Sequence, residues 1–174
     1  MKDNQKLKRI FAQDQHERKY FKKYQSVMGK NDKKRRSETK KIIDKNLLKT
    51  ATDYFMAGMI FQHGDKPEDY IFTQKLALKS AKLGEEQGKW LYAASTDRLL
   101  VNQGKKQKYG TQYHGVVIKD KKTGKEKMKM KLYPIDKRTT DKLRTEYNVP
   151  PLKQLQAREK EFTDKYFGKS EKID

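Results

Sequence analysis

The N-terminal third of the chain has an amphipathic pattern of apolar and polar positions. Over residues 5–28, apolar side chains recur every three or four positions, the spacing that places them on one face of a helix. Asp14 and Arg18 are four residues apart in this stretch, so their side chains can pair across one helical turn. The sequence at residues 29–32, Gly-Lys-Asn-Asp, then interrupts the pattern and predicts a turn.

A second and more apolar helical pattern follows over residues 37–62. A break is expected near residues 49–52, because Thr52 or Asp53 can cap a new helix there. Residues 54–61 are apolar on nearly every side of a helix. We therefore expect this last segment to be the buried central helix.

Two further helices that are joined at a glycine are predicted in the middle of the chain. The first begins at Asp65, a capping residue followed by Pro67, and ends at Gly84. The second continues from the acidic residues that follow Gly84 as far as Gly104. Because alanines occupy close-packing positions in both, we expect an antiparallel helical hairpin.

After Gly104 the pattern becomes that of β-strands. Residues 113–118 form a β-prone run, and residues 127–132 alternate strictly between lysine and an apolar residue. Residues 120–125 contain the glycine and polar residues of a turn between the two runs. Since two strands alone are only marginally stable, the predicted β-hairpin must pack against the helices.

The predicted fold class is mainly α, with a helical bundle or hairpin core, a packed two-stranded β-hairpin and a basic C-terminal helix. A short helix over residues 139–147 precedes this C-terminal helix, which begins near Leu152. The expected organisation is a basic N-terminal helix and linker (1–36), a helical core with the β-hairpin (37–155) and a charged C-terminal tail (156–174).

Charge is distributed unevenly along the chain. The 174 residues carry a formal net charge of +20, and only 33% are hydrophobic, which predicts a small core with solvated flanks. Residues 1–49 carry a net charge of +11, residues 50–104 of −1 and residues 105–174 of +10. Basic flanks of this kind attract polyanions by releasing counterions, although a lysine-rich surface also serves solubility alone.

Composition limits the chemistry and the compartment. The chain contains no cysteine, which excludes disulfides, thiol catalysis and thiolate metal sites. No apolar run approaches the roughly 20 residues of a membrane-spanning helix, and the first residues contain no apolar signal-peptide core. We therefore expect a cytoplasmic protein without a membrane partner, and the sequence leaves its oligomeric state open.

Polar residues beside the most apolar sequence form a candidate enzymatic site. His63 ends the central helix, where the helix dipole favours a protonated imidazole and a raised pKa. We consider His63 as an acid or base, Asp97 as its partner and Arg98 as an anion clamp. The backbone and hydroxyl donors of a following turn complete this candidate catalytic set, which adds Tyr109, Thr111 and Gln112. The alternative is a structural network in which Asp97 or Arg98 ties that turn to the helices.

Several motifs together resemble an uncharacterised, mainly bacterial family that is described only as a domain of unknown function. The resemblance rests on five segments within residues 10–155, which are Asp14-Gln15-x-x-Arg18, Gln62-His63-Gly64, Asp97-Arg98, Gln107-x-Tyr109-Gly110-Thr111-Gln112 and the stretch from Pro134 to Leu152. The chain departs from the family in its lysine richness and in the tail after Phe162. The resemblance implies where a site lies, and it implies no reaction.

No cofactor follows from the sequence. It contains neither the glycine-rich phosphate loop with Lys-Ser/Thr nor a Gly-x-Ser-x-Gly nucleophile turn. His16, His63 and His114 lie far apart, without a metal-binding pair on one helix, so we predict no metal site. The one alternative that we consider is a metal site made by His63, Asp97 and His114, which the fold would have to bring together in space.

Two groups of basic residues are candidates for binding a polyanion. Lys33, Lys34, Arg35 and Arg36 form a cluster that also reads as a solvated helix start, and Lys127, Lys129 and Lys131 form a row on the outer face of the β-hairpin. Basic and aromatic residues also alternate over residues 19–24, a pattern that suits stacking on nucleic acid. There, however, we expect Phe21 and Tyr24 to pack along the helix.

The favoured function is that of a basic accessory protein that binds RNA, DNA or a ribonucleoprotein surface through its flanks. A small enzyme with the His63 set, or a helical module that binds a protein partner, are the alternatives. The net charge favours the first function, and the polar residues beside the core favour the second. Neither decides the question, because net charge bears on association with a partner and not on chemistry.

Overall fold

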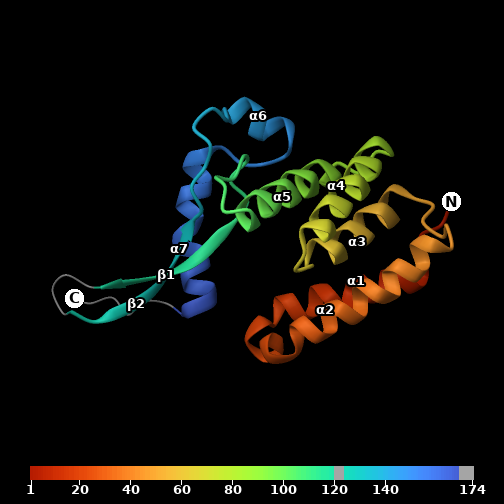
Figure 1. Ribbon diagram of the computed structural model, residues 1–174, viewed down its shortest axis with the longest axis horizontal. Coiled ribbons are helices and arrows are strands. Elements are labelled where there is room, and N and C mark those ends of the chain that lie inside the picture. The colour runs from red at the N-terminus through yellow and green to blue at the C-terminus, as the bar shows by residue number, and fades with distance from the viewer. Residues whose placement is uncertain (120–123, 169–174) are drawn as a thin grey trace.

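The computed structural model describes residues 1–119 and 124–168 (Figure 1). Within them the chain forms helices and one two-stranded antiparallel sheet, in the order α1 (Gln5–Lys19), α2 (Phe21–Asp44), α3 (Ala51–Gln62), α4 (Pro67–Lys82), α5 (Gln87–Asn102), β1 (Tyr113–Lys119), β2 (Glu126–Leu132), α6 (Asp141–Glu146) and α7 (Leu152–Phe167). The mainly helical fold predicted from the sequence is confirmed. None of the described helices is both long and apolar enough to cross a membrane.

The first two helices differ from the predicted arrangement. The break falls at Tyr20, and α2 continues as a helix through residues 29–32, where a turn was expected. The reason is tertiary, because Asp32 lies on the inner side of α2 and both its oxygens bind Arg18 at 2.8 Å. This ion pair holds α1 and α2 side by side and overrides the weak local turn preference. The boundary expected after residue 36 therefore falls inside α2.

Helix α3 is the buried centre, as predicted, but its cap differs from the expected one. Thr50 is the N-cap, and Asp53 completes a capping box with it. The Asp53 carboxylate also accepts from the backbone N–H of Asn4 at 2.8 Å, which ties the start of α1 to α3. The apolar side chains that α3 buries are Phe55, Met56, Ala57, Ile60 and Phe61.

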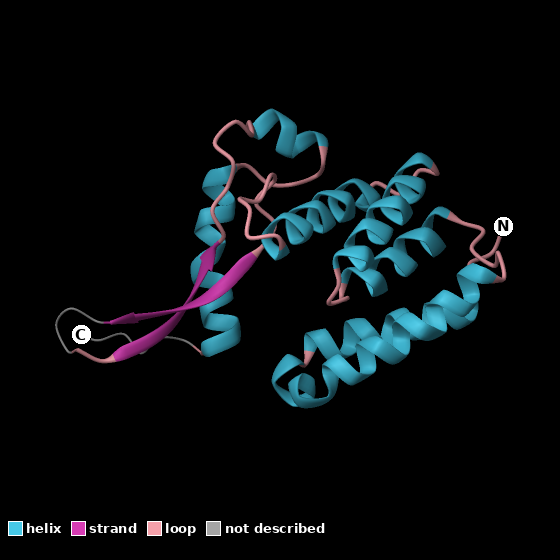
Figure 2. Ribbon diagram, viewed as in Figure 1, coloured by secondary structure: helices cyan, strands magenta, loops and turns pink. Residues whose placement is uncertain are grey.

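Helices α3, α4 and α5 pack closely because small residues lie at their contacts (Figure 2). A Cβ atom at Gly58 of α3 would come within 2.8 Å of Leu91 in α5. A Cβ atom at Gly88 of α5 would come within 2.7 Å of the backbone of Ala81 in α4. Helices α4 and α5 form the predicted antiparallel hairpin, so α3 and α5 run in the same direction on this body (Figure 1).

The β-hairpin extends away from the helical body, and α7 runs along it (Figures 1 and 2). Its register pairs Tyr113 with Leu132, and part of the predicted turn, residues 120–123, lies outside the described residues. The outer edge of β2 is covered by α7, because the backbone N–H groups of Met130 and Leu132 donate to Thr163 at 2.9 Å and Glu159 at 3.0 Å. The domain boundary expected after residue 155 falls inside α7.

Candidate functional site

Asp97 holds the turn that follows α5. Its carboxylate is fully buried and accepts five hydrogen bonds, all from the segment Lys108–Thr111. Oδ1 accepts the backbone N–H groups of Lys108 at 2.6 Å and Tyr109 at 2.8 Å. Oδ2 accepts the N–H groups of Gly110 and Thr111 and the Thr111 hydroxyl at 2.8 to 2.9 Å. Burial raises the pKa of Asp97, and the five donors oppose that rise by favouring the carboxylate.

The rest of the turn is equally occupied by structural contacts. Tyr109 is 1% exposed, and its carbonyl accepts from Arg144 at 2.9 Å. Gln107 binds the backbone N–H and carbonyl of Gln112, and it also reaches the carbonyl of Tyr133. Gly110 has φ +100°, and a Cβ atom there would come within 2.7 Å of Leu155. Asp97, Tyr109, Thr111 and Gln112 thus tie the turn to α5, as in the structural alternative. Among the described residues, the side-chain hydrogen bonds of His63 go to Arg18 and Asp14 and to none of these four.

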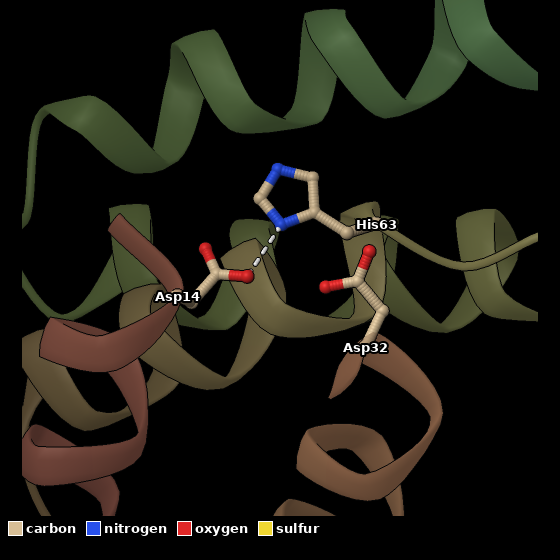
Figure 3. Close-up of side chains that lie close together, drawn as sticks. All are labelled: Asp14, Asp32 and His63. Carbon is tan, nitrogen blue, oxygen red and sulfur yellow. Dashed lines mark hydrogen bonds and ion pairs between the residues drawn. The ribbon is translucent and has the colours of Figure 1, made fainter. Parts of the chain in front are cut away.

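His63 instead meets residues of α1 and α2. Its Nδ1 lies 3.1 Å from Oδ1 of Asp14 and 3.0 Å from Nε of Arg18 (Figure 3). Asp14 is fully buried, and the His63 side chain is 11% exposed. The partner that orients the imidazole is therefore Asp14 and not Asp97. The i,i+4 spacing of Asp14 and Arg18 was the sequence signal for an ion pair on α1. Two charged residues at this spacing do not reveal which residue of another helix they will contact.

Arg35 adds three ion pairs to this group. Arg35 reaches Asp32 at 2.6 Å, Glu17 at 3.0 Å and Asp14 at 3.4 Å. Its side chain is 7% exposed, so the guanidinium lies inside the α1–α2 contact. Nε of Arg35 and Oε2 of Glu17 make ion pairs without a hydrogen bond, whereas the Arg35–Asp32 pair is hydrogen-bonded. Buried ion pairs of this kind rigidify an interface. The arginines of this region therefore act mainly within the protein.

The pKa of His63 is shifted in the direction opposite to the one expected at the end of a helix. Burial lowers the pKa of His63, although Asp14 pulls it upward, and the charges of Arg18 and Arg98 lower it further. The predicted rise from the helix dipole is outweighed by this desolvation. Burial alone would raise the pKa of Asp14, but its contacts with His63, Arg18 and Arg35 bring it below its usual value. His63 is consequently neutral at pH 7 beside an ionised Asp14.

The two contacts at Nδ1 of His63 are alternatives. Nε of Arg18 can only donate, so its contact requires a lone pair on Nδ1 and places the ring proton on Nε2. The contact with the Asp14 carboxylate requires the proton on Nδ1. Nε2 points away from both Asp14 and Asp32 (Figure 3). The site therefore offers either a donor or an acceptor at Nε2, according to which neighbour Nδ1 uses.

Arg98 and Gln62 contribute polar groups without partners. In the described chain, the buried Nε of Arg98 and the buried Oε1 of Gln62 have no hydrogen-bond partner. Burial lowers the pKa of Arg98, Arg18 lowers it further, and Tyr70 and Asp32 oppose this lowering. The structure thus brings Arg98 to the electrostatic neighbourhood of His63, as the predicted site required, while Asp97 on the same helix serves the turn.

A metal ion fits this group poorly. Within residues 1–119 and 124–168, Asp14, Asp32 and His63 are the one group of possible ligands whose donor atoms lie within 4.8 Å of one another. Both carboxylates already bind arginine, which supplies the positive charge that a metal ion would bring. The combination of His63, Asp97 and His114 is not assembled.

The predicted polyanion-binding residues are divided by the fold. Lys33 and Lys34 are exposed, whereas Arg35 is inside and Arg36 binds the carbonyl of His63 at 2.8 Å and Asp65 at 3.2 Å. The role expected of Arg35 and Arg36 needs free guanidinium groups, which these contacts occupy. On the β-hairpin, Lys129 and Lys131 are exposed and Lys127 is half-buried, and Lys131 pairs with Glu159 at 2.9 Å, which reduces the charge of the row.

A basic and aromatic surface forms where the two flanks meet. We call it the lysine–aromatic corner; it is a hollow of about 380 Å³ lined by Lys19, Tyr20, Phe21, Lys22, Lys23, Lys165 and Tyr166. Tyr20 is 47% and Phe21 37% exposed, and Phe21 meets Tyr166 of α7 edge-on with ring centres 5.6 Å apart. The expectation that Phe21 packs along a continuous helix is wrong, because the helix breaks at Tyr20. The alternation over residues 19–24 was the sequence signal for this surface.

Comparisons of the chain with family models, curated proteins and solved structures found no match. The resemblance to a family of unknown function therefore stays a prediction. Motif residues occur in both polar regions, the Asp97 turn and the His63 group, although Asp32 and Arg35 of the His63 group lie outside the motifs. The lysine–aromatic corner also lies outside them.

Proposed function

We propose that the protein binds single-stranded nucleic acid at the lysine–aromatic corner. The observation that carries the proposal is that the exposed rings of Tyr20 and Phe21 from the first flank meet the half-buried ring of Tyr166 from the second flank among lysines. The two flanks carry net charges of +11 and +10, and α7 brings the second against the start of α2. The proposal thus assigns the predicted polyanion binding of the flanks to this one surface.

The aromatic rings favour a single strand over a duplex. A base stacks on an exposed ring only when it is not paired within a helix, and such stacking contributes about 1–3 kcal/mol per base. Tyr20 and Phe21 present adjacent rings, and Lys19 lies over Tyr20 with Nζ 5.4 Å from the ring centre. The ammonium groups of the corner can then reach the phosphates on either side of a stacked base.

The use of lysine rather than arginine favours binding without sequence readout. The four cations of the corner are all lysines, which act as flexible point charges and lack the fork that reads guanine edges. Four phosphate contacts predict that log K falls with log salt concentration with a slope of roughly −3 for a single strand. Affinity should therefore depend strongly on salt and weakly on base sequence.

Fluorescence anisotropy with labelled single-stranded and duplex oligonucleotides tests the proposal. We expect binding of the single strand at about 50 mM salt that weakens steeply as salt is raised. Replacement of the four corner lysines, Lys19, Lys22, Lys23 and Lys165, by glutamine should remove most of this binding. Tyr20→Leu should weaken it while leaving the salt slope unchanged, and Tyr20→Phe should retain it.

The matched control changes four exposed lysines of the neutral middle segment, Lys66, Lys75, Lys82 and Lys89, to glutamine. This variant has the same net charge as the corner variant. If the two variants lost the same amount of oligonucleotide affinity, the binding would depend on net charge alone, which would contradict the proposed site. Tighter binding of the duplex than of the single strand would contradict the role of the aromatic rings.

A further inference from the structure

The β-hairpin has two outer edges, and α7 covers the one on β2. There the outward backbone N–H groups of Met130 and Leu132 donate to Thr163 at 2.9 Å and to Glu159 at 3.0 Å. Within the described residues, β1 pairs with β2 and with no third strand. The hairpin also extends away from the helical body (Figure 2). An open strand edge of this kind is a template on which another strand can pair.

The register of the hairpin identifies the backbone groups at the open edge of β1. The carbonyl of Gln112 accepts from the N–H of Tyr133 at 3.1 Å, so the even-numbered residues of β1 form the hydrogen-bonded pairs with β2. Gly115 and Val117 belong to the other pairs, and their N–H and C=O groups therefore point outward. The usual devices that block an edge are missing from the middle of β1, which contains no proline and has its one lysine at the last position, Lys119.

One face of the hairpin presents apolar side chains beside this edge. Val117 lies opposite Met128 in the register. A Cβ atom at Gly115 would come within 3.0 Å of Met128 and 3.2 Å of Phe167, so these two side chains meet over Gly115. Val117, Met128 and Phe167 are 59%, 41% and 42% exposed. Exposed apolar side chains that are contiguous, and not scattered singly, mark an interaction surface.

The opposite face of the hairpin is cationic. Lys127 and Lys129 lie on it opposite Ile118 and Val116, because paired residues of an antiparallel ladder share a face. Within the described residues these two lysines have no ion-pair partner, whereas Lys131 of the same row is neutralised by α7. A strand added to β1 would lie two strand spacings from β2, about 9–10 Å, which a lysine and a glutamate side chain span together.

We infer that the open edge of β1 binds an extended segment of a partner protein in which acidic and apolar residues alternate. Backbone hydrogen bonds to Gly115 and Val117 hold the segment as an added strand. Because side chains of a strand alternate between its two faces, the apolar residues cover Val117 and Phe167 while the acidic residues face Lys127 and Lys129.

The charge of the chain favours such a partner over a second copy of the same chain. Pairing of two β1 edges would join two chains that each carry a net charge of +20, and β1 contains no aspartate or glutamate to meet the lysines. The edge shares no residue with the lysine–aromatic corner, so the inference does not rest on the proposed function.

Two measurements on the full chain with one pair of peptides test the inference. The probe is a labelled peptide as long as β1, with blocked ends, that alternates valine and glutamate. The control peptide has the same residues in two blocks and therefore the same charge. In fluorescence anisotropy we expect the alternating peptide to bind about tenfold more tightly or better. In the complex, the amides of Gly115 and Val117 should exchange hydrogen about tenfold more slowly than in the free protein, whereas Val116, already bonded to β2, should change less.

Val117→Pro removes one outward N–H and leaves the ladder with β2 intact, because proline is tolerated where the N–H of an edge strand faces away from its partner. We expect about a tenfold loss of affinity for the alternating peptide, and a smaller loss for Val117→Ala, which keeps the N–H. Lys127→Gln with Lys129→Gln should weaken binding about fivefold. Lys66→Gln with Lys75→Gln removes the same charge elsewhere and should have little effect.

If Val117→Pro does not fold, hydrogen exchange of the unaltered protein decides. Equal affinities of the two peptides, unchanged exchange at Gly115 and Val117 in the complex, or equal losses in the two lysine variants would each overturn the inference. So would protection of these amides by a single-stranded oligonucleotide in place of the peptide, or protection that rises with protein concentration alone, which would indicate a second copy. The corner-lysine variant should still prefer the alternating peptide, so failure of nucleic-acid binding and failure of this inference are separate results.

Discussion

The Asp97 turn and the His63 group are both buried polar regions beside the same helices, yet they differ in how their hydrogen bonds are satisfied. Both oxygens of Asp97 are used by five donors from one short segment. In the His63 group one ring nitrogen has two competing neighbours, and nearby polar atoms of Gln62 and Arg98 have none. A fully satisfied network fixes a structure, whereas an unsatisfied one can respond to protons and ligands. The first region is therefore structural and the second is the better candidate for function.

The largest expected effect is the loss of stability on changing Asp97 to asparagine. The amide would place a donor against backbone N–H groups that point at the carboxylate, and several of them would lose their acceptor in the interior. We expect the free energy of unfolding to fall by about 3–5 kcal/mol. Urea unfolding followed by circular dichroism measures this change.

Asp65→Asn is the matched control, because the Asp65 side chain is 62% exposed and pairs only at the surface with Arg36. We expect it to change stability by no more than about 1 kcal/mol. A small effect of Asp97→Asn, similar to that of the control, would remove the contrast between a structural turn and a functional group. It would return Asp97 to the list of candidate catalytic residues.

A smaller effect is expected from acid, and it arises in the His63 group. Because burial lowers the pKa of His63 in the folded state, the unfolded chain binds more protons below pH 6.5, the ordinary value. The stabilisation is thus complete above pH 6.5 and is lost as pH falls toward the lowered pKa, by at most about 1.4 kcal/mol per pH unit. Asp14, whose pKa is also lowered, contributes its own loss only below its ordinary value of 3.8.

Urea unfolding at pH 7.5 and 5.5 isolates this contribution. The unaltered protein should lose more stability between the two pH values than His63→Gln, which has no group to titrate at that position. His16→Gln is the control, since His16 is exposed on α1 and should behave like the unaltered protein. If the stability of all three proteins had the same pH dependence, the protonation of His63 would not contribute to the loss of stability in acid.

The helices and the hairpin were predictable because they depend on local patterns. The apolar α3, the glycine-joined α4 and α5, and the alternating β2 each carry a period or a stop signal in the sequence. The course of α2 through residues 29–32 was not predictable, because the ion pair of Asp32 with Arg18 joins residues 14 positions apart. Local turn preference is weak beside such a contact.

The sequence indicated which residues belong to the candidate site, but it did not indicate which of them contact one another. His63 and Arg98 were chosen because they stand beside apolar sequence, and the structure brings them into electrostatic reach of each other. Asp97 was expected to join them, but adjacent residues on a helix point about 100° apart, and the fold sends Asp97 to the turn. Asp14, Asp32 and Arg35 complete the group from two other helices, which no spacing in a single sequence reveals.

The smallest expected effect is that of Arg98→Met in the His63 group, which we compare with the same substitution at Arg144, beside the Asp97 turn. Arg144 of α6 donates to the carbonyl of Tyr109 at 2.9 Å and to Thr139 and Asp141, so Arg144→Met should lower stability by about 2–3 kcal/mol. Arg98 makes no hydrogen bond at its buried Nε, so Arg98→Met should leave stability within about 1 kcal/mol and can increase it, because methionine fills the space without a charge. Urea unfolding followed by circular dichroism measures both variants. Equal losses would mean that Arg98 is held by the fold as firmly as Arg144, and the unsatisfied character that distinguishes the His63 group would disappear.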